Sequence, residues 1–275
     1  MRTITPIRNP LLVAVLGATL LAPAAASLAA GNQPPVEVTT CGQVLDGDGF
    51  LSADLDCSGF DDTVVISPKD GDVRGVAVVL RQNNSTLELR GHTLTAGTRR
   101  GVWCVKGCEI IGEGGSILGL AGNSGVYSGR SLKIEGVTVS LFADHGLQVR
   151  RRAKVLDSVI SDNVEHGIRA DGGALIRNSS IIDNGERGIS TGRAVRIYDS
   201  TVAGNQHHGI QAGKILVKDA TVTGNGVFGV CPNCGGTCVD LHAEKKPRLL
   251  GTSTCDKSRD PNGSCARDWG ICLND

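Results

Sequence analysis

The feature that most constrains this chain is a glycine followed by an aliphatic residue, which recurs at nearly constant spacing. The intervals between successive pairs are 21, 21, 21, 21 and 20 residues. The pairs are Gly125-Val126, Gly146-Leu147, Gly167-Ile168, Gly188-Ile189, Gly209-Ile210 and Gly229-Val230. A period of this length is typical of repeat proteins, in which each repeat buries its apolar residues against its neighbours.

Each repeat contains short stretches in which apolar and polar residues alternate. In one repeat, Ile168 and Ala170 flank Arg169, Ala174 and Ile176 follow two residues apart, and Ile181 comes later. Alternation of this kind predicts strands with one buried face, about three per repeat. Asp, Asn and Gly lie between them, as turns require. Helical repeats are excluded, because no ten-residue stretch of the array keeps a helical period free of glycine.

Such repeats must stack, with each strand about 4.8 Å from its counterpart in the next coil. We therefore expect an all-β, single-stranded right-handed parallel β-helix of about 21 residues per coil and seven or eight coils. A leucine-rich solenoid would need a regular Leu-x-x-Leu-x-Leu pattern, which these coils lack. An asparagine four residues before the glycine predicts a ladder of amides between coils, and we expect it and the glycines to be structural. The asparagines are Asn163, Asn184, Asn205 and Asn225.

The composition divides the chain into four regions. Residues 1–30 carry Arg2 and Arg8, an apolar run and then small residues, which predicts a secretory signal peptide. A membrane anchor is the weaker alternative because the apolar run is too short to span a bilayer. We expect an amino-terminal cap at 31–62, the β-helix at 63–230 and a cysteine-rich carboxy-terminal cap at 231–275. The mature protein would be extracellular or periplasmic, without a membrane span.

Ten cysteines in an exported chain indicate disulfides rather than free thiols or zinc. They gather near the two ends, where a solenoid exposes strand edges and core and needs caps. A redox pair or half a zinc site at Cys231 and Cys234 is disfavoured, because no βαβ pattern surrounds them and the compartment is oxidising. We expect pairing within the clusters Cys41 and Cys57; Cys104 and Cys108; and Cys231, Cys234, Cys238, Cys255, Cys265 and Cys272.

The net charge argues against one class of partner. The chain has 28 basic and 28 acidic residues, and removing Arg2 and Arg8 with the signal peptide leaves 26 against 28. A net charge near −2 is not that of a nucleic-acid-binding protein. We expect a monomer without a nucleic-acid partner.

Several segments resemble a known group of proteins. They are Cys41-Gly-Gln-Val-Leu45, residues 53–59, residues 87–94, the Gly-Ile repeats and Trp269-Gly-Ile-Cys-Leu-Asn-Asp275. Over nearly the whole mature chain they resemble the secreted bacterial right-handed parallel β-helix repeat proteins of the pectate-lyase-like superfamily. The resemblance implies the fold but not the reaction, since that superfamily includes lyases, hydrolases, epimerases and non-enzymatic adhesins. No catalytic motif of the group, such as Asp-Pro-His-Glu, occurs here, so no catalytic residue is transferred.

Two columns of polar residues form when the coils are aligned. Two residues before the glycine stand Asp144, Glu165, Glu186 and His207, and one residue before it stand His145, His166, Arg187 and His208. Stacking places column members about 5 Å apart, close enough to shift one another's pKa values. The outward positions of the following strands and turns add Gln148, Arg150, Arg169, Asp171, Ser190 and Gln211.

This strip predicts a polysaccharide site. His166 would be the catalytic base, and Arg169 and Arg187 would clamp uronate carboxylates. Binding residues would be His145, Gln148, Arg150, Ser190, His208 and Gln211. Asp144, Glu165 and Glu186 could hold Ca²⁺, the one cofactor considered, or act as the acid and base of a hydrolase. Because these are turn residues, we expect them to be exposed, so that replacing His166 or Arg187 would barely change the melting temperature.

The alternative is a non-catalytic structural or adhesive surface module, in which the charged columns serve only solubility. The chain has eight aromatic residues, few for stacking on sugars, and its coils are uniformly short, without long loops to wall a cleft. The sequence leaves open whether the protein is an enzyme.

Overall fold

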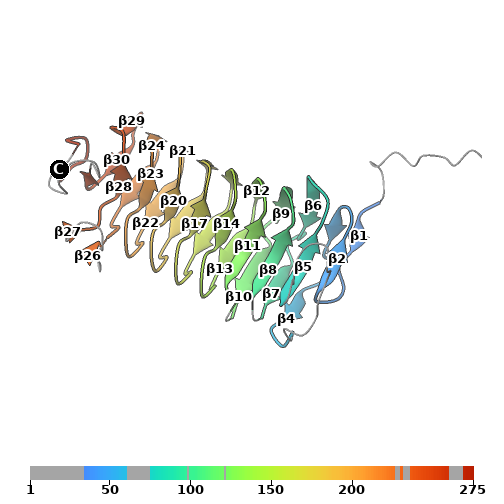
Figure 1. The fold of residues 1–275 in the computed structure, drawn as a ribbon. Helices are drawn as coiled ribbons and strands as arrows, with labels where there is room; N and C mark the ends of the chain where they lie inside the picture. Colours follow the sequence, from blue (N-terminus) through green and yellow to red (C-terminus); the bar gives the residue numbers. More distant parts are fainter. Residues whose placement is uncertain are drawn as a thin grey trace, which may run out of the picture. The chain divides into compact units, whose positions relative to one another are not determined.

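The computed structural model describes residues 34–60, 75–97, 99–120, 122–226, 230–231, 236–259 and 269–275. The expected signal peptide lies outside these ranges. The described chain winds through three parallel sheets, and Figure 1 shows the strands of successive coils side by side along the solenoid. The solenoid has about eight turns, and the right-handed parallel β-helix expected from the repeats is confirmed.

Sheet B begins each regular coil and faces the viewer in Figure 1. Its strands, in spatial order, are β2 (Gln43–Leu45), β5 (Val76–Leu80), β8 (Arg100–Cys104), β11 (Ser124–Ser128), β14 (Leu147–Val149), β17 (Ile168–Ala170), β20 (Ile189–Thr191), β23 (Ile210–Ala212), β28 (Leu241–Ala243) and β31 (Ser258–Arg259).

Sheet A follows sheet B within each coil. Its strands are β1 (Val36–Glu37), β3 (Gly49–Phe50), β6 (Ser85–Glu88), β9 (Cys108–Ile111), β12 (Leu132–Glu135), β15 (Ala153–Leu156), β18 (Ala174–Arg177), β21 (Ala194–Tyr198), β24 (Lys214–Lys218) and β29 (Arg248–Leu250). Sheet C closes the coil. Its strands are β4 (Leu55–Cys57), β7 (Thr93–Ala96), β10 (Ser116–Gly119), β13 (Thr138–Ser140), β16 (Val159–Ser161), β19 (Ser180–Ile182), β22 (Thr201–Ala203), β25 (Thr221–Thr223) and β30 (Thr254–Cys255).

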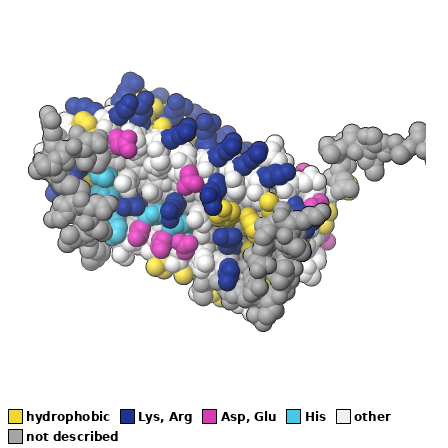
Figure 2. Space-filling view, viewed as in Figure 1, with side chains coloured by type: hydrophobic (Ala, Val, Ile, Leu, Met, Phe, Trp, Pro, Cys, Tyr) yellow, Lys and Arg dark blue, Asp and Glu magenta, His cyan; other side chains and the backbone are white. Residues whose placement is uncertain are grey.

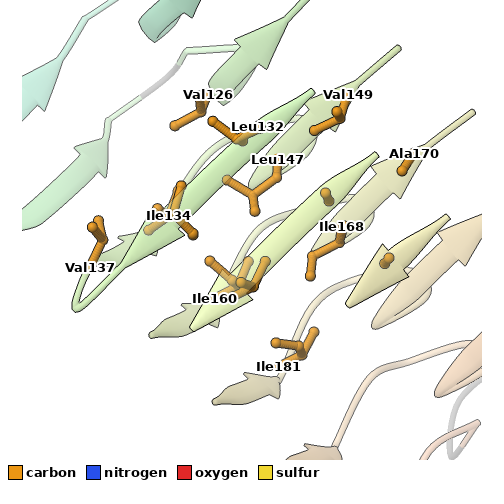
Figure 3. Packing of buried hydrophobic residues seen from close by; sticks show 14 of the residues in the cluster. Val126, Leu132, Ile134, Val137, Leu147, Val149, Ile160, Ile168, Ala170 and Ile181 are labelled. Atoms are coloured by element: carbon orange, nitrogen blue, oxygen red, sulfur yellow. The ribbon is translucent and has the colours of Figure 1, made fainter. Parts of the chain in front are cut away.

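Strand register follows the sequence period. Ile168 pairs with Ile189 and Ile189 pairs with Ile210, and all three side chains are fully buried. The core between the sheets is therefore a set of aliphatic columns, which Figure 3 shows from close by. Alternation within each strand sends every second side chain inward, so that Arg169 points outward between buried neighbours. The inward isoleucine stack predicted from the spacing is confirmed.

The asparagine ladder is also confirmed. Asn163 Nδ2 donates to Asn184 Oδ1 over 2.9 Å, and Asn184 Nδ2 donates to Asn205 Oδ1 over 2.9 Å. Asn205 donates to Asn225 over 2.8 Å, and the two central asparagines are fully buried. Each amide also accepts a backbone N–H from the coil before it, as Asn184 does from Asn163 over 3.3 Å. These bonds satisfy backbone groups that the turn would otherwise bury without a partner.

The repeat glycines are needed because neighbouring coils approach closely at these positions. A Cβ at Gly167 would lie 2.8 Å from Asn184 Nδ2 and 2.8 Å from the carbonyl oxygen of Gly188. Left-handed backbone is found elsewhere in the turns, as at Asp162 (φ 56°) and Asp183 (φ 55°). The repeat glycine therefore allows two coils to approach closely, whereas the repeat asparagine binds buried backbone groups of the same turn.

One repeat assignment is wrong. Val230, of the sixth glycine-aliphatic pair, does not continue sheet B; it lies in β26 (Val230–Cys231), which pairs antiparallel with β27 (Gly236–Thr237). The next strand of sheet B is β28, which pairs with β23. The ladder passes over this insertion, because Asn225 Nδ2 donates to the buried Asp240 over 2.8 Å. A constant spacing therefore predicted the wrong partner where the turn was lengthened.

Two of the described disulfides lie near the ends of the solenoid, and the third joins β8 to β9 within an early coil. Cys41–Cys57, Cys104–Cys108 and Cys255–Cys272 are bonded, each within its expected cluster. Cys238 is also disulfide-bonded. The side chains of Cys231, Cys234 and Cys265 lie outside the described residues, so the pairing of the last cluster is confirmed for one bridge. The four-region division stays a prediction, although β28, β29 and β30 extend all three sheets into the carboxy-terminal region. Within the described ranges, no helix has the length and apolar character to cross a membrane.

Candidate functional site

The predicted site residues meet on the outward face of sheet B and in the turns that lead into it. The strands place one outward side chain per coil in a single column, since Gln148 pairs with Arg169, Arg169 with Ser190, and Ser190 with Gln211. The same register continues to His242 on β28. Parallel in-register pairing therefore turns residues about 21 positions apart into neighbours about 4.8 Å apart.

This face is hollowed in two places. The larger hollow has a volume of about 500 Å³, and among the side chains that line it are Arg169, Ser190, Gln211, His242 and Glu244. The smaller has a volume of about 230 Å³ and is lined by Gln148, Val149, Arg150, Arg169 and Asp171. Because Arg169 and Asp171 line both, the hollows follow one another along the solenoid axis. We call them together the groove.

The expectation that the histidine column is exposed is wrong. His145, His166 and His208 keep only 1%, 5% and 5% of their surface exposed. Their rings stack along the column: the His145 and His166 centroids lie 5.0 Å apart with planes 3° from parallel. The turn folds the rings against neighbouring coils, which shields them from water. Replacing His166 must therefore affect stability, contrary to the prediction from turn position alone.

Each of the first two histidines lies between a carboxylate and an arginine. His145 Nδ1 is 3.1 Å from Asp144 and 3.3 Å from Glu165, while its Nε2 is 3.2 Å from an Arg169 guanidinium nitrogen. One coil later, His166 Nδ1 is 3.0 Å from Glu186, and its Nε2 is 3.5 Å from Arg187. The same arrangement of carboxylate, imidazole and guanidinium is thus built twice.

The position of the proton on each imidazole follows from the partners of its two nitrogens. Arginine can only donate, so Nε2 of each ring must accept, and we assign the single proton of the neutral ring to Nδ1, where it donates to the carboxylate. The backbone N–H of His166 also lies 3.4 Å from His145 Nδ1, and that of Arg187 lies 3.4 Å from His166 Nδ1. Both contacts are longer than those between Nδ1 and the carboxylates. In this tautomer, the lone pair of Nε2 is directed toward an arginine beside the groove.

Burial and neighbouring charges shift the ionisation of the column. Burial, followed by the nearby His145 and arginines, lowers the pKa of His166 to about 3. Burial also lowers the pKa of His145, and it lowers that of His208 to about 3. The opposite occurs at Glu165, where a hydrogen bond to Asp144 and then burial raise the pKa to about 7. At neutral pH the imidazoles of His145, His166 and His208 are therefore uncharged, and Glu165 carries a proton for part of the time.

One group of these residues could hold a cation. Ligand atoms of Asp144, His145 and Glu165 all lie within 4.8 Å of one another. Two carboxylates and one imidazole form a donor set that suits a transition ion or zinc better than Ca²⁺, which prefers six or more oxygens. The predicted trio of Asp144, Glu165 and Glu186 is not brought together as one cage, because Glu186 contacts His166 instead.

The structure adds a residue that sequence reasoning missed. His242 occupies the outward column of sheet B, and its ring stacks on that of His208 with 4.3 Å between centroids. The insertion before β28 hid its register. The alternation Leu241-His242-Ala243, which matches Ile210-Gln211-Ala212, was the available signal. Four other predicted binding residues line the groove: Gln148, Arg150, Ser190 and Gln211. Arg150 is exposed, and its Nε donates to the Tyr127 hydroxyl over 3.1 Å.

Comparison with known proteins gives one match. A family model described as a right-handed beta helix region matches residues 71–198 and 124–244, which together cover more than half of the chain. Searches among curated proteins and among solved structures returned no match.

Proposed function

We propose that this protein, which belongs to the right-handed β-helix family, binds a linear acidic polysaccharide in the groove on sheet B. The observation that carries the proposal is the outward column of that sheet. Each coil contributes one outward side chain to the column, and together they present guanidinium, hydroxyl, amide and imidazole groups. Arg169 lines both hollows of the groove.

The chemistry of the column fits an extended sugar chain with carboxylates. Arginine binds a carboxylate through two parallel N–H donors, and the exposed Arg150 and Arg169 provide such forks from adjacent coils. Ser190 and Gln211, one and two coils further on, supply groups that donate to and accept from sugar hydroxyls. A groove that follows the solenoid axis is suited to a linear polymer more than to a compact ligand.

A second candidate function, β-elimination within the polysaccharide, is favoured by the doubled carboxylate–imidazole–arginine arrangement. A uronate bound by Arg169 or Arg187 would have its carboxylate charge neutralised, which acidifies the C5 proton. Turning Arg169 or Arg187 from the ring to the uronate would free Nε2 of His145 or His166 to accept that proton, and the resulting imidazolium would be stabilised by Asp144, Glu165 or Glu186. The electrons of the C5–H bond would form the C4–C5 double bond, and the glycosidic oxygen at C4 would leave as an alkoxide that takes a proton from water.

Binding and cleavage can be tested together. We would titrate the disulfide-bonded protein with polygalacturonate, alginate and a neutral glucan by calorimetry, and follow the absorbance of unsaturated sugar ends in parallel. Arg169→Ala should weaken binding of the acidic polymers roughly tenfold, since a charge-assisted hydrogen bond contributes about 1.5–3 kcal/mol. The matched control is Arg196→Ala, an exposed arginine on β21 of sheet A, which should bind as the wild type does.

The outcomes separate the candidates. Binding without unsaturated product supports a binding protein, and product that disappears in His166→Gln supports the lyase. If the acidic polymers do not bind at all, or Arg169→Ala binds as tightly as Arg196→Ala, the groove is not the site. The structural or adhesive module then becomes the better description.

A further inference from the structure

A second charged feature lies at the opposite end of the sheet B strands from the histidines. Where the chain leaves sheet B for sheet A, nearly every coil carries exposed lysine or arginine. We call this the basic row; its members are Lys106, Arg130, Arg151, Arg152, Arg193, Lys214, Lys245 and Lys246. Figure 2 shows dark blue side chains following the upper edge of this face along the solenoid.

Backbone hydrogen bonds fix the spacing of the row independently of side-chain positions. The Arg130 N–H donates to the Lys106 carbonyl over 3.0 Å, and the Arg151 N–H donates to the Arg130 carbonyl over 2.9 Å. Further on, the Lys214 N–H donates to the Arg193 carbonyl over 3.0 Å. The backbones that carry cations in adjacent coils are therefore about one strand spacing, roughly 4.8 Å, apart. The row is interrupted at Gly172, where a Cβ would collide with the Arg151 carbonyl.

The fold gives no reason for these charges. Backbone requirements explain the Asp and Asn residues elsewhere in the turns, many of which have positive φ, but none of the eight cations does. Within the described part of the chain, none of the eight forms an ion pair. Like charges carried on adjacent coils repel one another. The row therefore costs the isolated protein stability and would be relieved by a polyanion.

We infer that the basic row is a second binding track, parallel to the groove, for a linear acidic polysaccharide with about one negative charge per sugar. The choice of a polysaccharide rests on the proposed function, whereas the cationic character of the track does not. A sugar ring in an extended chain is about as long as the step between coils, so successive charges can face successive cations. Single-stranded nucleic acid fits less well, because the described turns of the row carry no aromatic side chain for base stacking.

The track differs from the groove in how it would bind. Exposed lysines and arginines on an open edge neutralise charge and release counterions, so their contribution should fall steeply as salt rises. The groove has converging polar groups and should depend on the sugar. The row would thus hold the polymer on the protein while individual sugars enter the groove.

The test removes four charges from the row and four from elsewhere. The row variant carries Arg130→Gln, Arg151→Gln, Arg193→Gln and Lys214→Gln. The matched control carries Arg177→Gln, Arg196→Gln, Lys218→Gln and Arg248→Gln, which are exposed cations on sheet A. Both changes shift the net charge equally. Binding of polygalacturonate, single-stranded DNA and vesicles containing phosphatidylglycerol would be measured over a range of salt concentrations.

We expect the row variant to bind polygalacturonate at least tenfold more weakly at low salt, with a shallower salt dependence, while the control changes by about twofold or less. Equal losses in both variants would overturn the inference, because they would reflect net charge alone. Wild-type binding of DNA or vesicles as tight as that of polygalacturonate would overturn the choice of partner. The outcome is separate from that of Arg169→Ala. If Arg169→Ala binds polygalacturonate as the wild type does while the row variant binds it more weakly, the basic row is supported as a binding site and the groove is not.

Discussion

The two ends of the sheet B strands contrast in how they treat polar residues. The turns that enter the strands contain five acids and one arginine, together with the asparagine ladder, over residues 141–146, 162–167, 183–188 and 204–209. The turns that leave contain nine cations and two acids over residues 105–107, 129–131, 150–152, 171–173, 192–194, 213–214 and 244–247. At the entry, most of the ladder asparagines and three histidines are buried and hydrogen-bonded, whereas other polar residues, such as Asp162, are exposed; at the exit, all of the cations are exposed.

Within one repeat, opposite ends of the same strand can therefore have different roles, one structural and one in binding. The entry turns satisfy backbone groups from coil to coil, as Asn184 and Asn205 do, and substitution of these asparagines should destabilise the fold. The eight cations of the basic row form no ion pair within the described residues, and their substitution should affect binding far more than stability. Substitutions at the two ends should therefore differ in their effect on stability.

The strand between the two turns sets the scale. Ile189→Ala should lower the free energy of unfolding by about 2–5 kcal/mol, because Ile189 is fully buried between Ile168 and Ile210 and a cavity would remain. Chemical denaturation of the disulfide-bonded protein measures this directly. A loss below half a kcal/mol would mean that the coils are not stacked in this register.

The entry turn should come next. Asn184→Ala should cost about 1–3 kcal/mol, because it leaves the Asn163 N–H without its acceptor and breaks the amide ladder on both sides. The matched control is Gln206→Ala, at an exposed position in the following entry turn, which should change stability by less than 0.5 kcal/mol. Equal effects of the two substitutions would remove the distinction between ladder and solvent-facing residues.

The buried imidazoles should make stability fall in acid. The pKa of His166 is lowered from 6.5 to about 3 in the folded protein, so the unfolded chain binds more protons between these values. Its contribution is therefore fully present above pH 6.5 and is lost as the pH falls toward 3. His166→Gln should flatten the decline of the denaturation midpoint over this window. An unchanged pH profile in this variant would show that the ring is not buried in its neutral form.

Glu165 should act in the opposite direction. Its pKa is raised from 4.5 to about 7, so the folded protein holds the proton more tightly, and this stabilisation is present below pH 4.5 and lost as the pH rises through 7. Glu165→Gln should thus be more stable than the wild type at pH 8, with the advantage shrinking in acid. The control is Asp162→Asn, at an exposed acid in the same turn, which should show no gain in stability at pH 8.

The smallest effect is expected at the exit turns. Arg151→Gln and Arg193→Gln should each change the free energy of unfolding by less than 0.5 kcal/mol, with a slight gain from relieved repulsion. Thermal denaturation at low salt would reveal the gain, and added salt should abolish it. A loss of more than 1 kcal/mol in either variant would give the basic row a structural role and weaken the case for a binding track.

The sequence alone determined the repeat unit, the fold and the inward residues. A period of 21 with alternation inside it admits few solutions, because every apolar side chain must meet its counterpart one coil away. The asparagine ladder followed from the same constraint, as did the outward positions of Gln148, Arg169 and Ser190. These inferences depend on in-register stacking, which the spacing of residues along the chain predicts wherever the turns keep a constant length.

Which residues of the turns are buried, and what faces them, depends on the tertiary structure. The backbone path of a turn, not its position in the repeat, folded His145 and His166 against neighbouring coils and aimed their two nitrogens at a carboxylate and an arginine. The lengthened turn before β28 broke the period, so His242 joined the site although no spacing pointed to it. Periodicity specifies which strand pairs with which, whereas the direction of a turn side chain depends on local dihedral angles and on neighbours that come together only when the coils stack.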